Sequence, residues 1–152
     1  MSEADPLSQR RLRTWIRLLR LTRSSESYLR EFLRENFDTT LPRFDVMAAL
    51  YRRQTPLKMS ELSRMLLVSN GNTTAVIDRL EADGWVKRAP AKADRRVKEV
   101  QLTPKGTAQF EAQAAAHEAE VNKLFAKLED DDLDIIRDLF RRINGSHDDT
   151  AS

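Results

Sequence analysis

Cysteine is absent from this chain of 152 residues. Its absence excludes disulfide bonds, cysteine-bound metal clusters and regulation through thiol oxidation. The sequence also has no apolar run of about 18 residues and no signal-peptide pattern, so we expect a cytoplasmic protein that neither spans nor binds a membrane. Glycine occurs only 4 times, and no glycine-rich loop that could hold a phosphate group is present.

Residues with catalytic or metal-binding chemistry are scarce as well. The two histidines, His117 and His147, lie 30 positions apart and have no partners at metal-ligand spacing. The acidic run at residues 129–134 lacks the glycine and the distal glutamate of a calcium-binding loop, and it is typical of a helix cap instead. We therefore expect no metal, no cofactor and no enzymatic activity.

The distribution of charge points to a polyanionic partner. Residues 43–106 contain 13 basic and 7 acidic side chains, whereas residues 107–152 contain 5 basic and 11 acidic ones. The net charge of the whole chain is only +2, so this asymmetry does not appear in the overall composition. Ordinary solvated charge is the alternative explanation, but the basic segment coincides with the motif described next.

The central segment predicts two short helices in close succession. Met59, Leu62 and Met65 share one helical stripe, and a break at residues 68–70 leaves Ser69 to cap a second helix. Gly84 ends that second helix at a position that favours a left-handed backbone. The residues expected to point inward from the second helix are Thr73, Val76, Ile77 and Leu80.

Two β-prone runs follow, at residues 85–89 and 97–102, and a basic segment at residues 90–96 separates them. Two helices and then a basic hairpin make a winged helix-turn-helix. The sequence resembles that of the MarR family of bacterial transcription regulators, most specifically in the segments DRLEADGWVKR and KADRRVKEVQLTPKG. The resemblance covers about residues 10–144. It implies a mainly α fold of six helices with a small β-hairpin wing, in which the N- and C-terminal helices form a dimer.

The expected organisation is one domain over residues 1–152. A winged-helix DNA-binding lobe occupies about residues 43–103, and dimerisation helices occupy about residues 8–36 and 104–144. The segments at residues 1–7 and 145–152 are expected to be disordered tails.

The outer face of the second central helix is the principal candidate for reading DNA. Asn70 and Asn72 can each pair with adenine, and Arg79 can reach guanine or a phosphate. Thr74 can contact a thymine methyl group or a base acceptor, with Ala75 beside it. Ser60, at the start of the preceding helix, can cap that helix or bind a phosphate. The DNA-facing set in the two helices is Ser60, Ser69, Asn70, Asn72, Thr74, Ala75 and Arg79.

The wing tip supplies a second DNA-binding element. Arg95 is expected to enter a narrow, electronegative minor groove. The family resemblance implies that Asp94 pairs with an arginine to brace the loop, which leaves Arg96 either as that brace or as a phosphate contact. Lys92 and Lys98 are further phosphate candidates, although both fit solvated surfaces equally well.

The terminal helices carry more apolar surface than one small core can bury, which favours a two-fold dimer. Heptad spacing runs from Phe110 to Leu128, and a final helix follows it after an acidic cap at residues 130–132. The residues expected at the dimer interface are Leu12, Leu124, Leu128, Leu133, Ile136, Phe140 and Ile143.

The family resemblance also implies a cleft for a small aromatic acid or a phenol, between the dimerising helices and the DNA-binding lobe. An anionic ligand requires a cation among apolar walls, for which Arg43 and His117 are the candidates. The wall candidates are Trp15, Ile16, Leu19, Phe44 and Met47, although Trp15 and His117 would fit a packing role equally well.

The sequence therefore predicts a homodimeric repressor that a small aromatic or phenolic acid releases from a pseudo-palindromic operator. The alternative is a winged-helix module that binds proteins and not DNA. A basic wing and a polar helix face argue against this alternative, because protein interfaces depend on apolar and aromatic anchors. The sequence does not identify the operator, the regulated genes or the effector.

Overall fold

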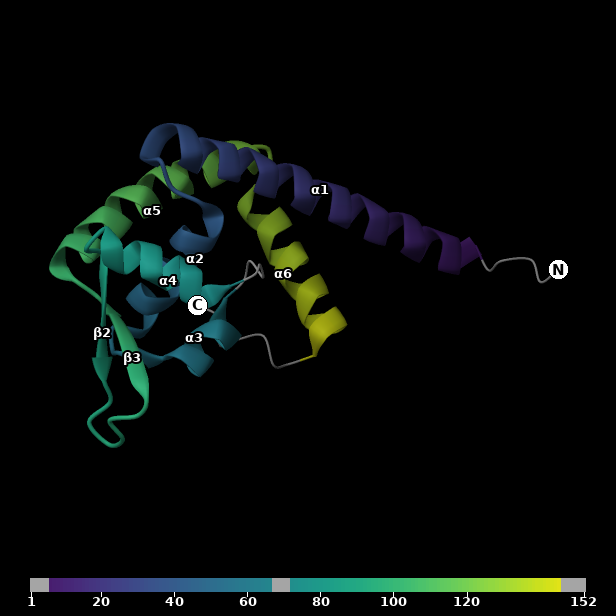
Figure 1. Ribbon diagram of the computed structural model, residues 1–152. Helices are drawn as coiled ribbons and strands as arrows, with labels where there is room; N and C mark the ends of the chain where they lie inside the picture. Colours follow the sequence, from purple (N-terminus) through teal and green to yellow (C-terminus); the bar gives the residue numbers. More distant parts are fainter. Residues whose placement is uncertain (1–5, 67–71, 146–152) are drawn as a thin grey trace. The chain divides into compact units, whose positions relative to one another are not determined.

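The computed structural model describes residues 6–66 and 72–145, which form two compact units divided after residue 118 (Figure 1). Within these residues there are six helices and three strands, which confirms the predicted mainly α winged helix. The helices are α1 (Pro6–Phe37), α2 (Leu41–Arg53), α3 (Met59–Met65), α4 (Thr73–Ala82), α5 (Pro104–Leu124) and α6 (Asp130–Asn144). The strands are β1 (Leu57–Lys58), β2 (Val86–Pro90) and β3 (Lys98–Leu102).

The first two helices begin earlier than the sequence predicted. Helix α1 begins at Pro6, inside the expected N-terminal tail, and continues through the serine pair at positions 24 and 25. Helix α2 begins at Leu41 and not at residue 43, because the Thr40 side chain accepts a hydrogen bond from the backbone N–H of Arg43 and caps the helix. Pro42 lies in the first turn, where a missing N–H costs nothing.

The wing is part of a three-stranded antiparallel sheet and not an isolated hairpin. Strands β2 and β3 pair along their whole length, from Val86 opposite Leu102 to Pro90 opposite Lys98. The two-residue strand β1 pairs with the other edge of β3, with Leu57 opposite Val100. The strand β1 was not predicted from the sequence, because a run of two residues carries no alternating pattern.

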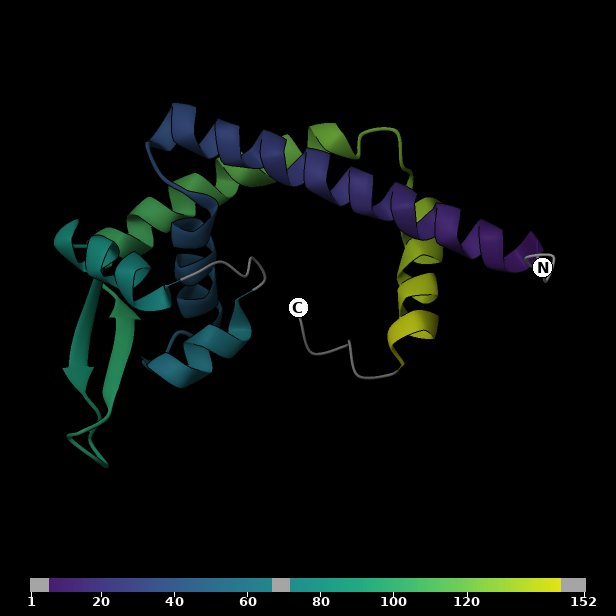
Figure 2. The same cartoon turned by 45° about the vertical axis from the view of Figure 1, so that its right-hand side comes forward.

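The core of the N-terminal unit lies between α2, α3, α4 and the sheet (Figure 2). It contains Met47, Leu62, Ile77, Leu80 and Val100, whose side chains are fully buried. The inward face predicted for the second central helix is correct, because Ile77 and Leu80 are in this core and Val76 packs against it. Burying such apolar side chains is the main favourable contribution to folding.

The turns around Gly84 and Gly106 bind the start of α5 to the end of α4. The Thr103 hydroxyl donates to the Gly84 carbonyl at 2.7 Å and accepts from the Gly106 N–H at 3.0 Å. The Thr103 N–H donates to the Trp85 carbonyl at 3.0 Å. Gly84 has a φ of +77°, as the predicted left-handed cap requires. The Leu-Thr-Pro-Lys-Gly segment therefore fixes the start of α5 to the turn that follows α4.

The C-terminal unit contains the end of α5 and all of α6. Helix α5 ends at Leu124, so the predicted heptad stops there and Leu128 lies in the connecting turn. Helix α6 is capped by Glu129 rather than by residues 130–132, and a reciprocal pair of side-chain and backbone hydrogen bonds joins Glu129 to Asp132. Asp130 and Asp131 lie in the first turn, where the helix dipole favours negative charge.

Large apolar side chains are exposed on both terminal helices. On α1 they include Leu12 and Trp15, each 59% exposed, and on α6 they include Phe140 at 48% and Ile143 at 72%. No residue of α6 is buried. Scattered exposed leucines are ordinary, but a continuous apolar helix face indicates an interaction surface. Within the described residues, no helix combines the length and the hydropathy needed to cross a membrane.

Candidate nucleic-acid interface

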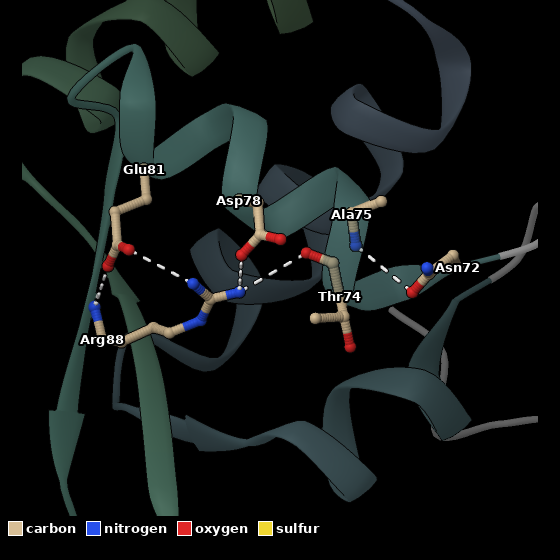
Figure 3. Close-up of polar contacts among 6 residues, drawn as sticks. All are labelled: Asn72, Thr74, Ala75, Asp78, Glu81 and Arg88. Carbon is tan, nitrogen blue, oxygen red and sulfur yellow. Dashed lines mark hydrogen bonds and ion pairs between the residues drawn. The ribbon is translucent and has the colours of Figure 1, made fainter.

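Helix α4 begins later than predicted, and this changes the role of Asn72. The sequence predicted Ser69 as the cap and placed Asn72 on the outer face of the helix. In the structure Asn72 itself caps α4. Its side-chain oxygen accepts a hydrogen bond from the Ala75 N–H at 3.3 Å (Figure 3). Ser69 and Asn70 lie outside the described residues. An asparagine that caps a helix still has its amide N–H₂ available to a base or a phosphate.

The outer face of α4 presents small and polar groups. Thr74, Ala75 and Arg79 are all exposed, as the sequence predicted for a face that enters a groove of DNA. Arg79 is held by Asp83, with its Nε atom 3.3 Å from the carboxylate. That contact orients the guanidinium group along the last turn of the helix and leaves part of it open, since the arginine side chain is 53% exposed.

Arg88 of β2 clamps the wing to the recognition helix (Figure 3). Its guanidinium donates to Asp78 at 2.5 Å, to Glu81 at 3.2 Å and to the Thr74 carbonyl at 3.4 Å. Its backbone N–H also donates to Glu81, at 3.0 Å. The arginine side chain is only 23% exposed, so these charge-assisted bonds are partly shielded from water. Helix α4 and the wing, the two elements predicted to read DNA, therefore hold a fixed relative orientation.

The role of Arg88 was not predicted from the sequence. The signal that could have found it is the pair Asp78 and Glu81, one helical turn apart on the face assigned to DNA. Two carboxylates on such a face would repel phosphates unless a cation neutralised them. Arg88, which follows in the next strand, is within reach of both carboxylates.

The wing tip carries exposed cations on a braced turn. The Asp94 carboxylate accepts a hydrogen bond from the Arg96 backbone N–H at 3.0 Å and lies 3.8 Å from the Arg96 Nε. A second hydrogen bond closes the loop, because the Val97 N–H donates to the Asp94 carbonyl at 3.0 Å. Asp94 therefore contacts Arg96, and Arg95 is exposed beside it. The contact with Asp94 makes Arg96 the bracing arginine, one of the two roles considered for it, and the minor-groove contact of Arg95 stays a prediction.

The remaining candidates in this lobe lie on its surface. Lys92, Lys98 and Ser60 are all exposed. Ser60 is the second residue of α3, whose N-cap position is Lys58, and no side chain caps that helix. The capping alternative for Ser60 is therefore not observed, and its phosphate contact stays a prediction.

The proposed effector residues lie in several different places. Phe44 and His117 stack, with ring centroids 4.6 Å apart, and the ring centroid of Phe110 lies 5.5 Å from that of Phe44. Met47 is fully buried in the core, so its side chain does not reach a ligand-accessible surface. Arg43 lines a different opening, where α2 meets α4. Three further candidates, Trp15, Ile16 and Leu19, lie along α1, and the first two are exposed.

His117 makes folding stability depend on pH. Partial burial lowers the pKa of this histidine below its usual value near 6.5. The unfolded chain then binds the proton more readily, so the histidine's contribution to stability is complete above about pH 6.5 and is lost as the pH falls below it. We expect the thermal midpoint to decrease as the pH is lowered from 7.5 to 5.

A matched variant isolates this contribution. His117→Phe keeps an aromatic ring against Phe44 and removes the titration, so its thermal midpoint should change less over the same range. Differential scanning calorimetry of both proteins at several pH values measures the difference. Parallel pH profiles would show that His117 does not cause the dependence.

Comparisons with known proteins agree with this geometry. The model of the MarR family matches residues 39–98. An HTH-type transcriptional regulator of Bacillus cereus is 36% identical over 97 residues, which are 64% of this chain and 63% of the relative. The match thus spans less than two thirds of that curated relative.

Two solved structures match nearly the whole chain. A MarR family transcriptional regulator from Silicibacter pomeroyi is 30% identical with a TM-score of 0.76, over 92% of this chain and 97% of that one. A mutant MarR from E. coli complexed with operator DNA is 26% identical with a TM-score of 0.74, over 92% of this chain and 99% of that one. The fold is that of MarR winged-helix proteins, and the names of the first two relatives confirm the expectation of a regulator and not an enzyme.

Proposed function

Because this chain belongs to the MarR family of transcription regulators, we propose that it is a homodimeric repressor that binds a pseudo-palindromic operator in the cytoplasm. The observation that carries the DNA-binding part is the Arg88 clamp, which holds α4 and the basic wing in one orientation. A recognition helix suits the major groove and an exposed arginine suits the minor groove beside it. The E. coli relative crystallised with operator DNA supports this assignment.

The dimer is proposed from the apolar faces of the terminal helices. Leu133, Phe140 and Ile143 lie on one side of α6 and are all at least 48% exposed, and Leu12 and Trp15 of α1 are each 59% exposed. A second copy would cover such surfaces, and a two-fold axis would place two recognition helices in successive major grooves about 10 base pairs apart. Leu124, Leu128 and Ile136 are the other proposed interface residues.

Release of DNA by a small aromatic or phenolic acid is the third part of the proposal. The absence of cysteine from the sequence excludes a thiol-based trigger. The half-buried aromatic pair Phe44 and His117, together with Trp15, Ile16 and Leu19 of α1, offers apolar walls, and Arg43 offers the cation. Aromatic carboxylates match this combination of groups.

A winged-helix module that binds proteins is the competing function. Such an interface depends on apolar or aromatic anchors at its centre. The described outer face of α4 presents Thr74, Ala75, Asp78 and Arg79, and each of them is exposed. None of these side chains is a large apolar group, so the observed surface favours a nucleic-acid partner.

Arg95→Ala tests the DNA-binding proposal. Removing this exposed cation should weaken operator binding by about 1.5–3 kcal/mol per half-site, the usual net contribution of a hydrogen bond to a charged group. The loss should be largest at A/T-rich flanks, and the dependence of affinity on salt should become shallower by roughly two ions per dimer. Fluorescence anisotropy at several salt concentrations measures both effects.

Arg142→Ala is the matched control, because it removes an exposed arginine outside the winged-helix lobe and should leave both quantities unchanged. If Arg95→Ala bound operator like the unmodified protein at every salt concentration, the wing would not contact DNA. Asn72→Ala is a poorer probe, since it also removes the cap of α4 and costs about 1 kcal/mol of helix stability.

A further inference from the structure

A pocket of about 310 Å³ lies between the end of α2, the strand β3 and the start of α5. All of its lining residues belong to the N-terminal unit, and none of them is a residue proposed to bind DNA, to bind the acidic effector or to form the dimer. Leu50, Tyr51 and Leu102 are its apolar and aromatic lining residues. The ring of Tyr51 is held against Phe110, with centroids 4.9 Å apart. Small-molecule sites begin at about 300 Å³, so the pocket suits a small ligand.

The charge in this pocket has one sign. Among the described residues that line it, Glu111 is the only charged one. One oxygen of its carboxylate accepts a hydrogen bond from the Tyr51 hydroxyl at 3.0 Å, and no described cation forms an ion pair with it. This hydrogen bond and the negative charge of Glu111 raise the pKa of Tyr51 above its usual value near 10. A carboxylate that is fixed in place and lacks a cation favours a positively charged ligand.

The end of α2 adds to the negative potential. Helix α2 ends at Arg53, and Gln54 caps it with a left-handed φ of 54°. The Gln54 backbone N–H donates to the Leu50 carbonyl, while later carbonyl groups of the last turn have no helical partner. The C-terminal end of a helix carries partial negative charge and favours a cation. Arg52 and Arg53 belong to the same helix end, but neither lines the pocket.

Four neutral polar side chains complete the lining, and none of them makes a side-chain hydrogen bond with a described residue. They are Gln54, Thr55, Gln101 and Thr107. Each has an oxygen that can accept a hydrogen bond, and an ammonium group has three N–H donors to offer. A divalent metal ion fits less well, because the described residues contain no group of three or more side chains that could hold one.

We propose that this pocket binds a small primary amine in its protonated form. The ammonium group would donate hydrogen bonds to the Glu111 carboxylate and to the amide oxygens of Gln54 and Gln101. The apolar body would lie against Tyr51 and Leu102, and the electron-rich face of the tyrosine ring would add to the attraction for the cation. This ligand is opposite in charge to the proposed acidic effector, and the two sites share no residue.

The pocket also specifies what the amine does to the protein. Its lining residues come from α2, from β3 and from α5, three elements that are far apart in the sequence. A ligand that contacts all three binds the folded chain and not the unfolded one, so it stabilises the fold by mass action. The thermal midpoint should therefore rise with the amine concentration.

The first experiment compares ligands on the full chain by isothermal titration calorimetry at pH 7 and constant ionic strength. The probes are 2-phenylethylamine, the uncharged 2-phenylethanol, the anionic 3-phenylpropionate and ammonium chloride. We expect 2-phenylethylamine to bind at least about tenfold more tightly than each of the others, since a hydrogen bond to a charged group is stronger than a neutral one. Equal affinity for the amine and the alcohol would overturn the proposal. So would equal affinity for the amine and the ammonium ion.

The second experiment changes the carboxylate. Glu111→Gln keeps the shape of the side chain and an acceptor for the Tyr51 hydroxyl, and it should weaken binding of 2-phenylethylamine about tenfold or more. It should also abolish the rise of the thermal midpoint. Glu118→Gln is the matched control, because it neutralises an exposed glutamate two turns later on α5 that does not line the pocket. The control should bind the amine like the unmodified protein.

Equal binding by Glu111→Gln and the unmodified protein would overturn the site. An equal loss in Glu118→Gln would overturn it as well, since the amine would then respond only to the overall charge. Nuclear magnetic resonance of the ¹⁵N-labelled chain locates the ligand independently, because the side-chain amide signals of Gln54 and Gln101 should shift with the amine. Shifts confined to other residues would place the amine elsewhere and contradict the proposal. None of these measurements involves DNA, so their outcome does not depend on operator binding.

Discussion

Replacing Gly106 with alanine is expected to lower the free energy of unfolding by about 3 kcal/mol or more. A Cβ atom at this position would lie 1.8 Å from the Trp85 carbonyl oxygen and 2.7 Å from its carbonyl carbon. Both are backbone atoms held by the Thr103 hydrogen bonds, so no side-chain rotation relieves the overlap. The start of α5 would have to move away from the turn that precedes β2. Urea denaturation followed by circular dichroism measures the loss.

Gly84→Ala is the control for this variant. Gly84 has a φ of +77°, which disfavours alanine, but a Cβ atom there would meet only the flexible Lys105 side chain at 3.8 Å. Its loss should be about 1 kcal/mol, the usual penalty for a left-handed alanine. A Gly106→Ala protein as stable as the Gly84→Ala protein would show that the close approach of the two backbones does not matter.

Phe140→Glu is expected to convert the proposed dimer into a monomer and to reduce operator affinity at least about a hundredfold. Phe140 is 48% exposed in the single chain and lies on the apolar side of α6. A carboxylate buried there in a dimer would have no partner, and burying an unpaired charge is among the costliest changes available to an interface. Sedimentation equilibrium should then report about 17.5 kDa instead of twice that mass.

The control introduces the same carboxylate on the polar side of the same helix. Arg141→Glu should leave both the mass and the operator affinity within about twofold, as surface ion pairs contribute little. A Phe140→Glu protein that sediments as a dimer would remove α6 from the interface. A monomeric protein that still binds operator with full affinity would remove the need for a dimer.

Periodicity in the sequence was sufficient to predict the helices and the wing, because their apolar positions repeat with the spacing of a helix or a strand. Ile77 and Leu80 were assigned correctly to the core for this reason. Helix ends were less predictable. The start of α4 was misplaced because Ser69 and Asn72 are both good capping residues, and only the backbone conformation shows that Asn72 is used.

Features that depend on contacts between distant residues were not predictable. The strand β1 is defined only by its pairing with β3, more than 40 positions later. Met47 shares a helix with Arg43 and Phe44, but its burial depends on which side of α2 faces the sheet.

The clamp made by Arg88 also offsets the negative charge of α4. Helix α4 contains two acidic residues, Asp78 and Glu81, and one basic residue, Arg79, so the helix proposed to meet DNA is itself negatively charged. Arg88 places its positive charge 2.5 Å from one carboxylate and 3.2 Å from the other. An acidic helix can thereby approach a polyanion without strong repulsion. In the proposed complex, Arg88 would thus favour DNA binding through the two negative charges it offsets, and it would need no phosphate contact of its own.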